Sequence, residues 1–309
     1  MHVFLFPGQG SQAVGMGKDL AERFAHARRR YQEAADVLGF DLARICFDGP
    51  EDELRQTRVT QPALYVHSCI LADLLAEREI RPAAAAGHSL GEYSALYAAG
   101  AFSFADGLRL VKARAEAMQK AGQINTGTMA AIVGLNDEAV AKLCEEMSDR
   151  EVVVPANYNS PGQLVISGDV PAVKRAVEAA KARGAKLARE LPVSGAFHSP
   201  LMKPAADSLA AALKTVPLKS PQVPVISNVT GKAHTDVESL RRLLSEQLLS
   251  PVRWTQSVSE LARMSDAQWL EVGSGNVLAG LLKRIVPGAS AVTIGSAADL
   301  DKLTEEAKA

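Results

Sequence analysis

The pentapeptide Gly87-His88-Ser89-Leu90-Gly91 constrains the fold of this chain more than any other feature. It fits the G-x-S-x-G pattern of a nucleophile elbow, a sharp turn between a strand and a helix. The serine of such a turn has a strained backbone, so the positions two before and two after it must be small. An apolar run at Ala83–Ala86 precedes it and a helical segment at Glu92–Ala99 follows it. The pattern predicts a nucleophilic Ser89 at a helix N-terminus; the alternative is a tight turn with an incidental serine.

Segments with strand and helix patterns alternate before residue 121 and again after residue 200. Such alternation is typical of a parallel sheet with helices on its faces. We therefore predict an α/β fold whose large, α/β-hydrolase-like domain comprises residues 1–124 and 196–309. Its predicted strands are Val3–Phe6, Ala83–Ala86, Val223–Asn228 and Gln268–Val272. Its other predicted helices are Lys18–Leu38, Asp52–Gln56, Gln61–Glu77, Phe104–Ala121, Leu201–Lys214, Val237–Leu248, Val252–Met264 and Val277–Arg284.

The intervening segment, residues 125–195, has a different pattern. Its elements follow the order β-α-β-β-α-β, which is typical of a small ferredoxin-like domain. We therefore predict a ferredoxin-like subdomain inserted into the large domain, with a cleft between the two that favours ligand binding. The predicted strands are Met129–Leu135, Val152–Ala156, Leu164–Ser167 and Lys186–Val193. One predicted helix is capped by Asn136 and runs to about Met147, and the other is Val170–Arg183.

Composition narrows the possible partners and the compartment. The net charge of −1 implies no general polyanion-binding surface, so we expect no nucleic-acid partner. No apolar run approaches a membrane span, and Val3–Phe6 is far too short for a signal peptide. Arg28–Arg30 is a small basic cluster, which we interpret as a solvated helix face. Three widely spaced cysteines without metal-ligand spacing predict reduced thiols in a cytoplasmic protein: Cys46, Cys69 and Cys144.

A serine nucleophile needs a base, and His198 is the best candidate among the six histidines. It follows a predicted strand at the predicted domain junction, where a loop would face the cleft. No carboxylate between Ser89 and His198 has a setting that favours the role of the acidic residue in a triad. Three of them resemble helix-start residues: Asp106, Asp137 and Asp169. Two arrangements therefore stay open, namely a triad with an acidic residue and a Ser-His pair whose imidazole is held by a backbone carbonyl.

Arg114 is a second candidate for chemistry. On the predicted helix Phe104–Ala121 it shares the apolar face with Val111 and Met118, which lie three residues before it and four after it. A buried guanidinium is costly without an anionic partner. Two anionic partners are possible for Arg114. One is an internal carboxylate, for example that of Glu92, in a salt bridge, and the other is a substrate carboxylate held by Arg114 as a clamp. The second predicts an acyl group that is itself an acid.

The segment Phe6–Gln12 follows the first predicted strand and is rich in glycine. It lacks the lysine and the spacing of a phosphate-binding loop. Its glycines allow the backbone to approach another group closely, so a backbone N–H there could complete an oxyanion hole with that of Leu90. A tight strand–helix turn without such a role is the alternative.

In combination, these motifs resemble the malonyl-CoA:acyl carrier protein transacylase family. The resemblance covers nearly the whole chain in the expected order, and it extends to the acyltransferase domains of polyketide synthases. Ser274 departs from the pattern, because many relatives have Pro at this turn. The matching segments are Phe6–Gln12, Thr60–Ala63, Gly87–Leu96, Asn159–Gln163, Phe197–Ser199 and Glu271–Gly273.

The resemblance implies a ping-pong acyl transfer without a metal or a cofactor. Ser89 would attack the thioester of malonyl-CoA, and His198 would act first as general base and then as general acid. The backbone N–H groups of Gln9 and Leu90 would hold the oxyanion. The main-chain carbonyl of Gln247 would orient the imidazole, which accounts for the absence of an acidic third residue. The phosphopantetheine thiol of acyl carrier protein would then take the malonyl group for fatty acid synthesis.

The resemblance also implies how the acyl group is selected. Arg114 would bind the free malonyl carboxylate. Phe197 precedes the histidine, as in malonyl-type polyketide acyltransferases, and would crowd an α-methyl branch by about 1–3 kcal/mol. Because the carrier protein is acidic in this family, we expect a basic surface near the cleft. The candidates, for which a solvated face is the alternative, are Lys181, Arg183, Lys186 and Arg189.

We expect the protein to be a monomer. Three other hypotheses about its function remain at this stage. A hydrolase would pass the acyl group to water, and Arg114 argues against it because related editing hydrolases lack a carboxylate clamp. A transferase acting for a polyketide synthase or a malonate decarboxylase would share the reaction and differ only in the carrier. A non-enzymatic docking module with a dead site conflicts with the presence of Ser89, His198 and Arg114 together.

Overall fold

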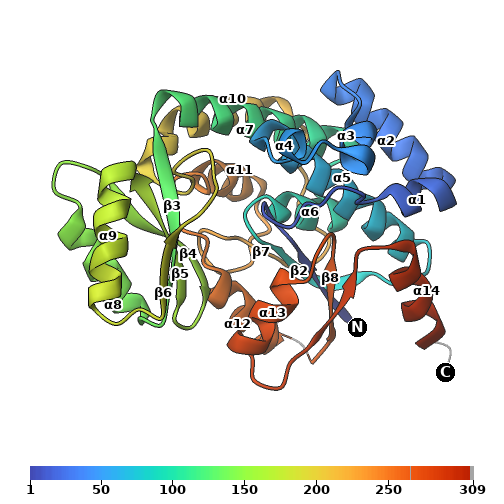
Figure 1. Cartoon of the computed structure of the whole chain (residues 1–309). Helices are drawn as coiled ribbons and strands as arrows, with labels where there is room; N and C mark the ends of the chain where they lie inside the picture. Colours follow the sequence, from blue (N-terminus) through green and yellow to red (C-terminus); the bar gives the residue numbers. More distant parts are fainter. Residues whose placement is uncertain (265, 307–309) are drawn as a thin grey trace.

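A computed structural model describes residues 1–264 and 266–306 of the chain. It contains two sheets of opposite character (Figure 1). A five-stranded parallel sheet lies among most of the helices, and a four-stranded antiparallel sheet lies to one side of the molecule. The predicted α/β fold, with a parallel sheet and a smaller ferredoxin-like sheet, is confirmed. Within the described residues, no helix is both long and apolar enough to cross a membrane.

The parallel sheet combines strands from both ends of the chain. Its order is β7-β2-β1-β8-β9, and every neighbouring pair is parallel. Because the carboxyl ends of parallel strands meet at one edge, the loops after β1, β2 and β7 come together there. The strands are β1 (His2–Phe6), β2 (Pro82–Gly87), β7 (Val225–Ile226), β8 (Gln268–Val272) and β9 (Ala291–Ile294).

Each face of the parallel sheet has its own hydrophobic core. Along β1, Phe4 and Phe6 belong to the larger core, whereas Val3 and Leu5 belong to the smaller one. Successive side chains of a strand point to opposite faces, so helices must cover both sides. The smaller core includes α12 (Trp254–Met264) and α13 (Val277–Ile285). The larger core includes α1 (Lys18–Arg23), α2 (Ala25–Leu38), α3 (Leu42–Asp48), α4 (Glu51–Leu54), α5 (Thr57–Ala76), α6 (Gly91–Ala98), α7 (Phe104–Ile124), the 3₁₀ turn η1 (Pro200–Met202), α10 (Lys203–Thr215), α11 (Val237–Glu246) and α14 (Ala297–Glu306).

The antiparallel sheet has a third core, formed only by residues between Ala130 and Ala188. Its strand order, β4-β5-β3-β6, is that of a ferredoxin-like βαββαβ unit. Backbone hydrogen bonds join it to the parallel part, because Val252 N–H donates to Ala156 O at 2.8 Å and Tyr158 N–H donates to Val252 O at 2.9 Å. The elements are β3 (Gly127–Val133), α8 (Asp137–Met147), β4 (Val153–Ser160), β5 (Gln163–Asp169), α9 (Val170–Ala182) and β6 (Leu187–Glu190).

The structure differs from the predicted elements in three respects. The helix predicted over 18–38 is broken into α1 and α2, because Phe24 is extended with φ −111° and ψ 122°. The strand predicted over 223–228 contains only β7, because the backbone N–H of Asn228 donates to the Glu92 carboxylate. The sequence patterns do not predict α3, β9 or α14, and the structure adds them.

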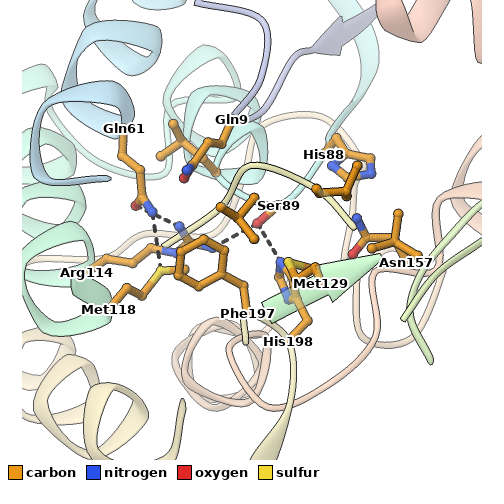
Figure 2. Close-up of a pocket in the computed structure, with 14 residues that line it drawn as sticks. Gln9, Gln61, His88, Ser89, Arg114, Met118, Met129, Asn157, Phe197 and His198 are labelled. Atoms are coloured by element: carbon orange, nitrogen blue, oxygen red, sulfur yellow. Dashed lines mark hydrogen bonds between the residues drawn. The ribbon is translucent and has the colours of Figure 1, made fainter. Parts of the chain in front are cut away.

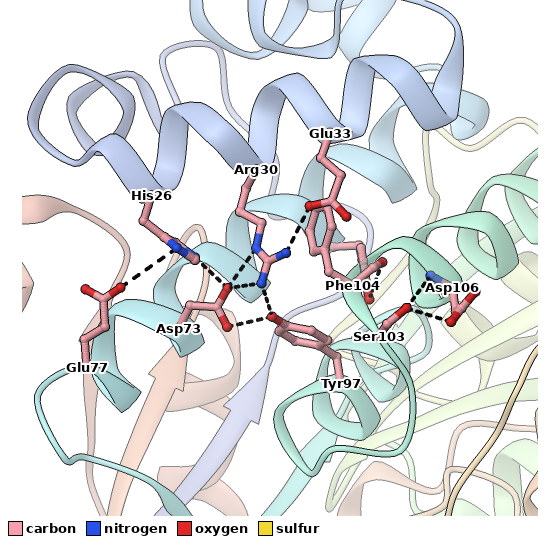
Figure 3. Close-up of polar contacts among 10 residues, drawn as sticks. His26, Arg30, Glu33, Asp73, Glu77, Tyr97, Ser103, Phe104 and Asp106 are labelled. Atoms are coloured by element: carbon pink, nitrogen blue, oxygen red, sulfur yellow. Dashed lines mark hydrogen bonds and ion pairs between the residues drawn. The ribbon is translucent and has the colours of Figure 1, made fainter.

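One polar cluster, here called the Arg30 cluster, joins α2, α5, α6 and α7 (Figure 3). Arg30 Nε donates to Asp73 Oδ2 at 3.0 Å, and Nη1 donates to Glu33 Oε2 at 3.0 Å. Nη2 donates to the Tyr97 hydroxyl at 2.9 Å, and the guanidinium lies 4.5 Å from the centroid of the Phe104 ring. The Arg30 side chain is only 22% exposed, so the predicted solvated face of this basic cluster is wrong at Arg30.

Candidate active site

The elbow between β2 and α6 forms as the glycine pattern predicts. Ser89 has a left-handed backbone, with φ 52°. A Cβ atom on Gly87 would overlap the backbone of Gly91, and one on Gly91 would overlap the carbonyl oxygen of Phe6. No larger residue fits either position without a backbone shift, so the two glycines allow the tight turn that presents the Ser89 hydroxyl.

Ser89 and His198 form a hydrogen-bonded pair (Figure 2). Ser89 Oγ lies 2.8 Å from His198 Nε2, and His198 Nδ1 lies 2.8 Å from the main-chain oxygen of Gln247. A carbonyl oxygen only accepts, so Nδ1 carries the hydrogen and Nε2 is free to accept the serine proton. Of the two arrangements left open by the sequence, the structure has a Ser-His pair oriented by a backbone carbonyl.

The environment of His198 keeps its imidazole neutral. The side chain is buried, and its backbone has a positive φ of 58°. Burial, and then the positive charge of Arg114, lower the pKa of His198 to about 3. Since the ring is unprotonated at pH 7, it can accept a proton from the Ser89 hydroxyl.

Arg114 points into the same cavity and is fully buried (Figure 2). Its Nη1 donates to Gln61 Oε1 at 2.7 Å. Its Nη2 donates to Ser89 Oγ at 3.0 Å and to Gln247 Oε1 at 2.9 Å. These acceptors are all neutral, and Nε has no partner among the described residues. The internal salt bridge with Glu92 is not formed, and burial lowers the pKa of Arg114.

The cavity between the two sheets has a volume of about 110 Å³. Typical pockets for drug-sized ligands are larger, roughly 300–1,000 Å³, so the size of this cavity suits a small group. The predicted selectivity residue Phe197 lies in its wall, beside Arg114 (Figure 2). The lining residues are Gln9, Gln61, His88, Ser89, Leu90, Arg114, Met118, Met129, Asn157, Val165, Leu191, Val193, Phe197 and His198.

Two backbone N–H groups are available beside the nucleophile. Gln9 and Leu90 both line the cavity, and neither N–H has an acceptor among the described residues. The loop after β1 reaches the elbow because Gly8 lacks a side chain: a Cβ there would overlap the carbonyl oxygen of His88. The predicted oxyanion donors therefore lie at one site, on two loops from the carboxyl ends of adjacent strands.

Two residues, Asn228 and Glu92, hold the elbow in a way that was not predicted from the sequence. Asn228 Oδ1 accepts from the backbone N–H of Ser89 at 2.6 Å, and its Nδ2 donates to Gly87 O at 2.7 Å. Glu92 accepts from the backbone N–H of Asn228 at 3.0 Å. The available signals were the position of Glu92 directly after the elbow motif and that of Asn228 at the end of a predicted strand. Among residues 1–264 and 266–306, no cluster of His, Cys, Asp or Glu suits a metal ion.

Comparisons with known proteins agree with this site. Residues 3–299 match the sequence model of the family described as acyl transferase domain. The chain is 49% identical, over 284 residues, to a protein from Escherichia coli strain K12 called malonyl CoA-acyl carrier protein transacylase. The match covers 92% of each protein. The chain belongs to this transacylase family of acyl transferases.

Solved structures of transacylases have the same fold. An acyl carrier protein S-malonyltransferase from Vibrio cholerae is 46% identical and superposes with a TM-score of 0.94, over 98% of this chain and 99% of that one. A malonyl-transacylase in complex with its type II PKS acyl-carrier protein is 45% identical, with a TM-score of 0.95 and 99% of both chains covered. The Ser89–His198 pair therefore lies in a transacylase fold, within an enzyme of the acyl transferase class.

Proposed function

We propose that this enzyme transfers the malonyl group of malonyl-CoA to the phosphopantetheine thiol of acyl carrier protein, for fatty acid synthesis. One observation carries the proposal: the Arg114 guanidinium, buried and without a carboxylate partner among the described residues, donates to Ser89 Oγ at 3.0 Å. An acyl group on Ser89 that ends in a carboxylate would supply the missing negative charge. The names of the E. coli relative and of the complexed malonyl-transacylase support malonyl as the group and acyl carrier protein as the acceptor.

In the first half-reaction, Ser89 Oγ attacks the thioester carbonyl carbon and gives its proton to His198 Nε2. The backbone N–H groups of Gln9 and Leu90 stabilise the oxyanion as charge develops on the carbonyl oxygen. When the carbon–sulfur bond breaks, the CoA thiolate takes the proton from His198, and the malonyl ester of Ser89 remains. The contact between His198 Nδ1 and the Gln247 carbonyl keeps the imidazole in the tautomer that this exchange needs.

In the second half-reaction, the phosphopantetheine thiol gives its proton to His198 Nε2 and attacks the ester carbonyl. The Ser89 oxygen leaves and recovers its proton from the imidazole, so the enzyme returns to its starting state. The residues named supply all the groups of both steps, and we propose that no metal or cofactor takes part. Phe197 would favour malonyl over groups with an α-methyl branch, because its ring forms part of the cavity wall.

Intact-mass measurement after brief exposure to malonyl-CoA tests the proposal. We expect one malonyl adduct on the wild-type protein, its removal on addition of holo acyl carrier protein, and no adduct on Ser89→Ala. A malonyl adduct on Ser89→Ala would contradict the assignment of the nucleophile. Rapid release of free malonate without the carrier protein would instead indicate a hydrolase.

Two further expectations belong to this proposal. The free, buried cysteines support a cytoplasmic location, since reduced thiols are typical of that compartment: Cys46, Cys69 and Cys144. The monomeric state stays a prediction. Of the proposed carrier-binding residues, Lys181 and Arg183 already form ion pairs with Glu178 and Glu146, which favours a solvated face for those two.

A further inference from the structure

A buried carboxylate lies behind the Ser89–His198 pair. Glu92 is 2% exposed and stands on α6, three residues after Ser89. Its Oε2 accepts from the Gln247 side-chain amide at 2.7 Å and from the Asn228 backbone N–H at 3.0 Å. Neither donor is charged, and neither bond is explained by the chemistry proposed above.

The two groups held by Glu92 are those that place the reacting atoms. The Gln247 side-chain amide also donates to the Ser89 carbonyl oxygen at 3.0 Å, and the main-chain oxygen of Gln247 accepts from His198 Nδ1 at 2.8 Å. The Asn228 side chain accepts from the Ser89 backbone N–H at 2.6 Å. The Glu92 Oε2 atom is therefore linked to the Ser89 backbone by two paths of two hydrogen bonds each. One path runs through Gln247 to the Ser89 carbonyl oxygen, and the other runs through Asn228 to the Ser89 N–H.

The cost of burying this carboxyl argues that its hydrogen bonds matter. Burial raises the pKa of Glu92 to about 7, although hydrogen bonds from Asn228 and Gln247 oppose the shift. An uncompensated charge in such a place is unfavourable, whereas an oxygen that accepts two hydrogen bonds at once satisfies two buried donors. Removing it would leave the Asn228 backbone N–H unpaired and would leave the Gln247 amide with only its bond to the Ser89 carbonyl oxygen.

We propose that Glu92 is a positioning residue for the acyl transfer, and the proposal rests on the function proposed above. Glu92 fixes the Gln247 side chain and the Asn228 backbone. Through these two residues it keeps the His198 imidazole and the Ser89 backbone in the relative positions that the reaction needs. It contacts no reacting atom, so it acts through its two partners.

Glu92→Ala and Glu92→Gln test this role. For Glu92→Ala, the rate of Ser89 acylation by malonyl-CoA should fall about 100-fold, the loss expected from a misplacement of about 1 Å. Labelling of Ser89 by a small neutral fluorophosphonate should fall by the same factor, because this reagent needs the pair and not the Arg114 clamp. Glu92→Gln should restore both rates to within about threefold, since an amide oxygen also accepts two hydrogen bonds.

Glu271 provides a matched control. It is a fully buried carboxylate on β8, and it accepts from the backbone N–H groups of Leu278 and Ala279 at 3.0 and 2.7 Å. Glu271→Ala should lower the melting temperature and leave both rates of the folded protein unchanged. If Glu92→Ala behaves like Glu271→Ala, Glu92 is merely structural and the proposal is overturned.

Two further outcomes decide the question. If Glu92→Ala does not fold, Gln247→Leu cuts the same link from the other side and keeps the main-chain carbonyl, so both rates should again fall together. Normal fluorophosphonate labelling of folded Gln247→Leu, or a Glu92→Gln protein as slow as Glu92→Ala, overturns the proposal. Failure of the proposed function looks different: wild-type protein would be labelled by the fluorophosphonate but would not be acylated by malonyl-CoA.

Discussion

The Arg30 and Arg114 side chains are both largely buried, but the groups that contact their guanidinium ions differ. Arg30 donates to the carboxylates of Asp73 and Glu33, at 3.0 Å each. Burial alone would lower the pKa of Arg30, but Tyr97 and Asp73 raise it above its ordinary value. Arg114 reaches only amide and hydroxyl oxygens, and burial lowers its pKa.

The difference shows how a structural arginine is distinguished from a binding one. The Arg30 cluster contains its own counterions, so it is complete without a ligand and serves to join helices. Arg114 is more deeply buried and has only neutral contacts, so its charge is balanced at contact distance only when an anion enters the cavity. Burial by itself therefore does not identify the binding residue; the identity of the contacting oxygens does.

Arg114→Ala should break the site and leave the fold intact. We expect kcat/KM for malonyl-CoA to fall about 100-fold or more, since removing one partner of a buried charge pair costs roughly 2–5 kcal/mol. Acetyl-CoA should become relatively better, because the empty clamp no longer rejects an uncharged acyl group. Steady-state rates with both thioesters measure this, and an unchanged malonyl-to-acetyl preference would refute the clamp.

Gln61→Glu should give Arg114 an internal carboxylate partner, as Arg30 already has. Gln61 Oε1 lies 2.7 Å from Arg114 Nη1, so a carboxylate of the same shape would form an internal ion pair there. The substrate carboxylate would then meet a like charge, and we expect KM for malonyl-CoA to rise by about tenfold or more. Gln61→Leu is the control, because it removes the hydrogen bond without adding a charge. Equal KM values for the two variants would count against the electrostatic explanation.

Arg30→Ala should have the opposite outcome, a loss of stability without a loss of selectivity. The Asp73 carboxylate would lose its guanidinium partner in a half-buried cluster, at a cost of about 1–3 kcal/mol in the free energy of unfolding. Urea denaturation measures this cost. The malonyl-to-acetyl preference of the folded protein should match that of the wild type, and a changed preference would show that the two arginines are not separate in function.

The fall of kcat/KM at low pH, here called the acid limb, should respond differently to substitution of the two arginines. Because the pKa of His198 is lowered to about 3, its imidazole stays neutral until the pH approaches that value, and kcat/KM should fall only there. Arg114→Gln removes the nearby positive charge, so the pKa of His198 should rise and the limb should move to higher pH. Burial remains the larger cause, so the limb should stay below the ordinary imidazole value of about 6.5. Arg30→Ala should leave the limb in place.

Local patterns predict much of the fold. The alternation of strands and helices indicates the parallel sheet, and the glycines at 87 and 91 indicate the elbow, because backbone sterics act between near neighbours in the chain. The short elements α3, β9 and α14 have no comparable pattern and form by packing onto the rest. The break at Phe24 inside a helical pattern is likewise a tertiary effect, since nothing in its own sequence ends the helix.

The site divides in the same way. Ser89, His198 and Arg114 are recognisable from the chain alone, since a nucleophile in an elbow, a histidine after a strand and a charge on an apolar helix face are local features. The partners of these groups leave no such local pattern, because they reach the site from helices and loops distant in sequence. Gln247 was predicted only through the family resemblance, and Gln61 and Asn228 were not predicted as partners. Whether a buried guanidinium meets a carboxylate or an amide depends on side chains brought together only by packing. Because of this difference in partners, Arg30 joins helices through internal ion pairs, whereas Arg114 is left free to bind an anionic ligand.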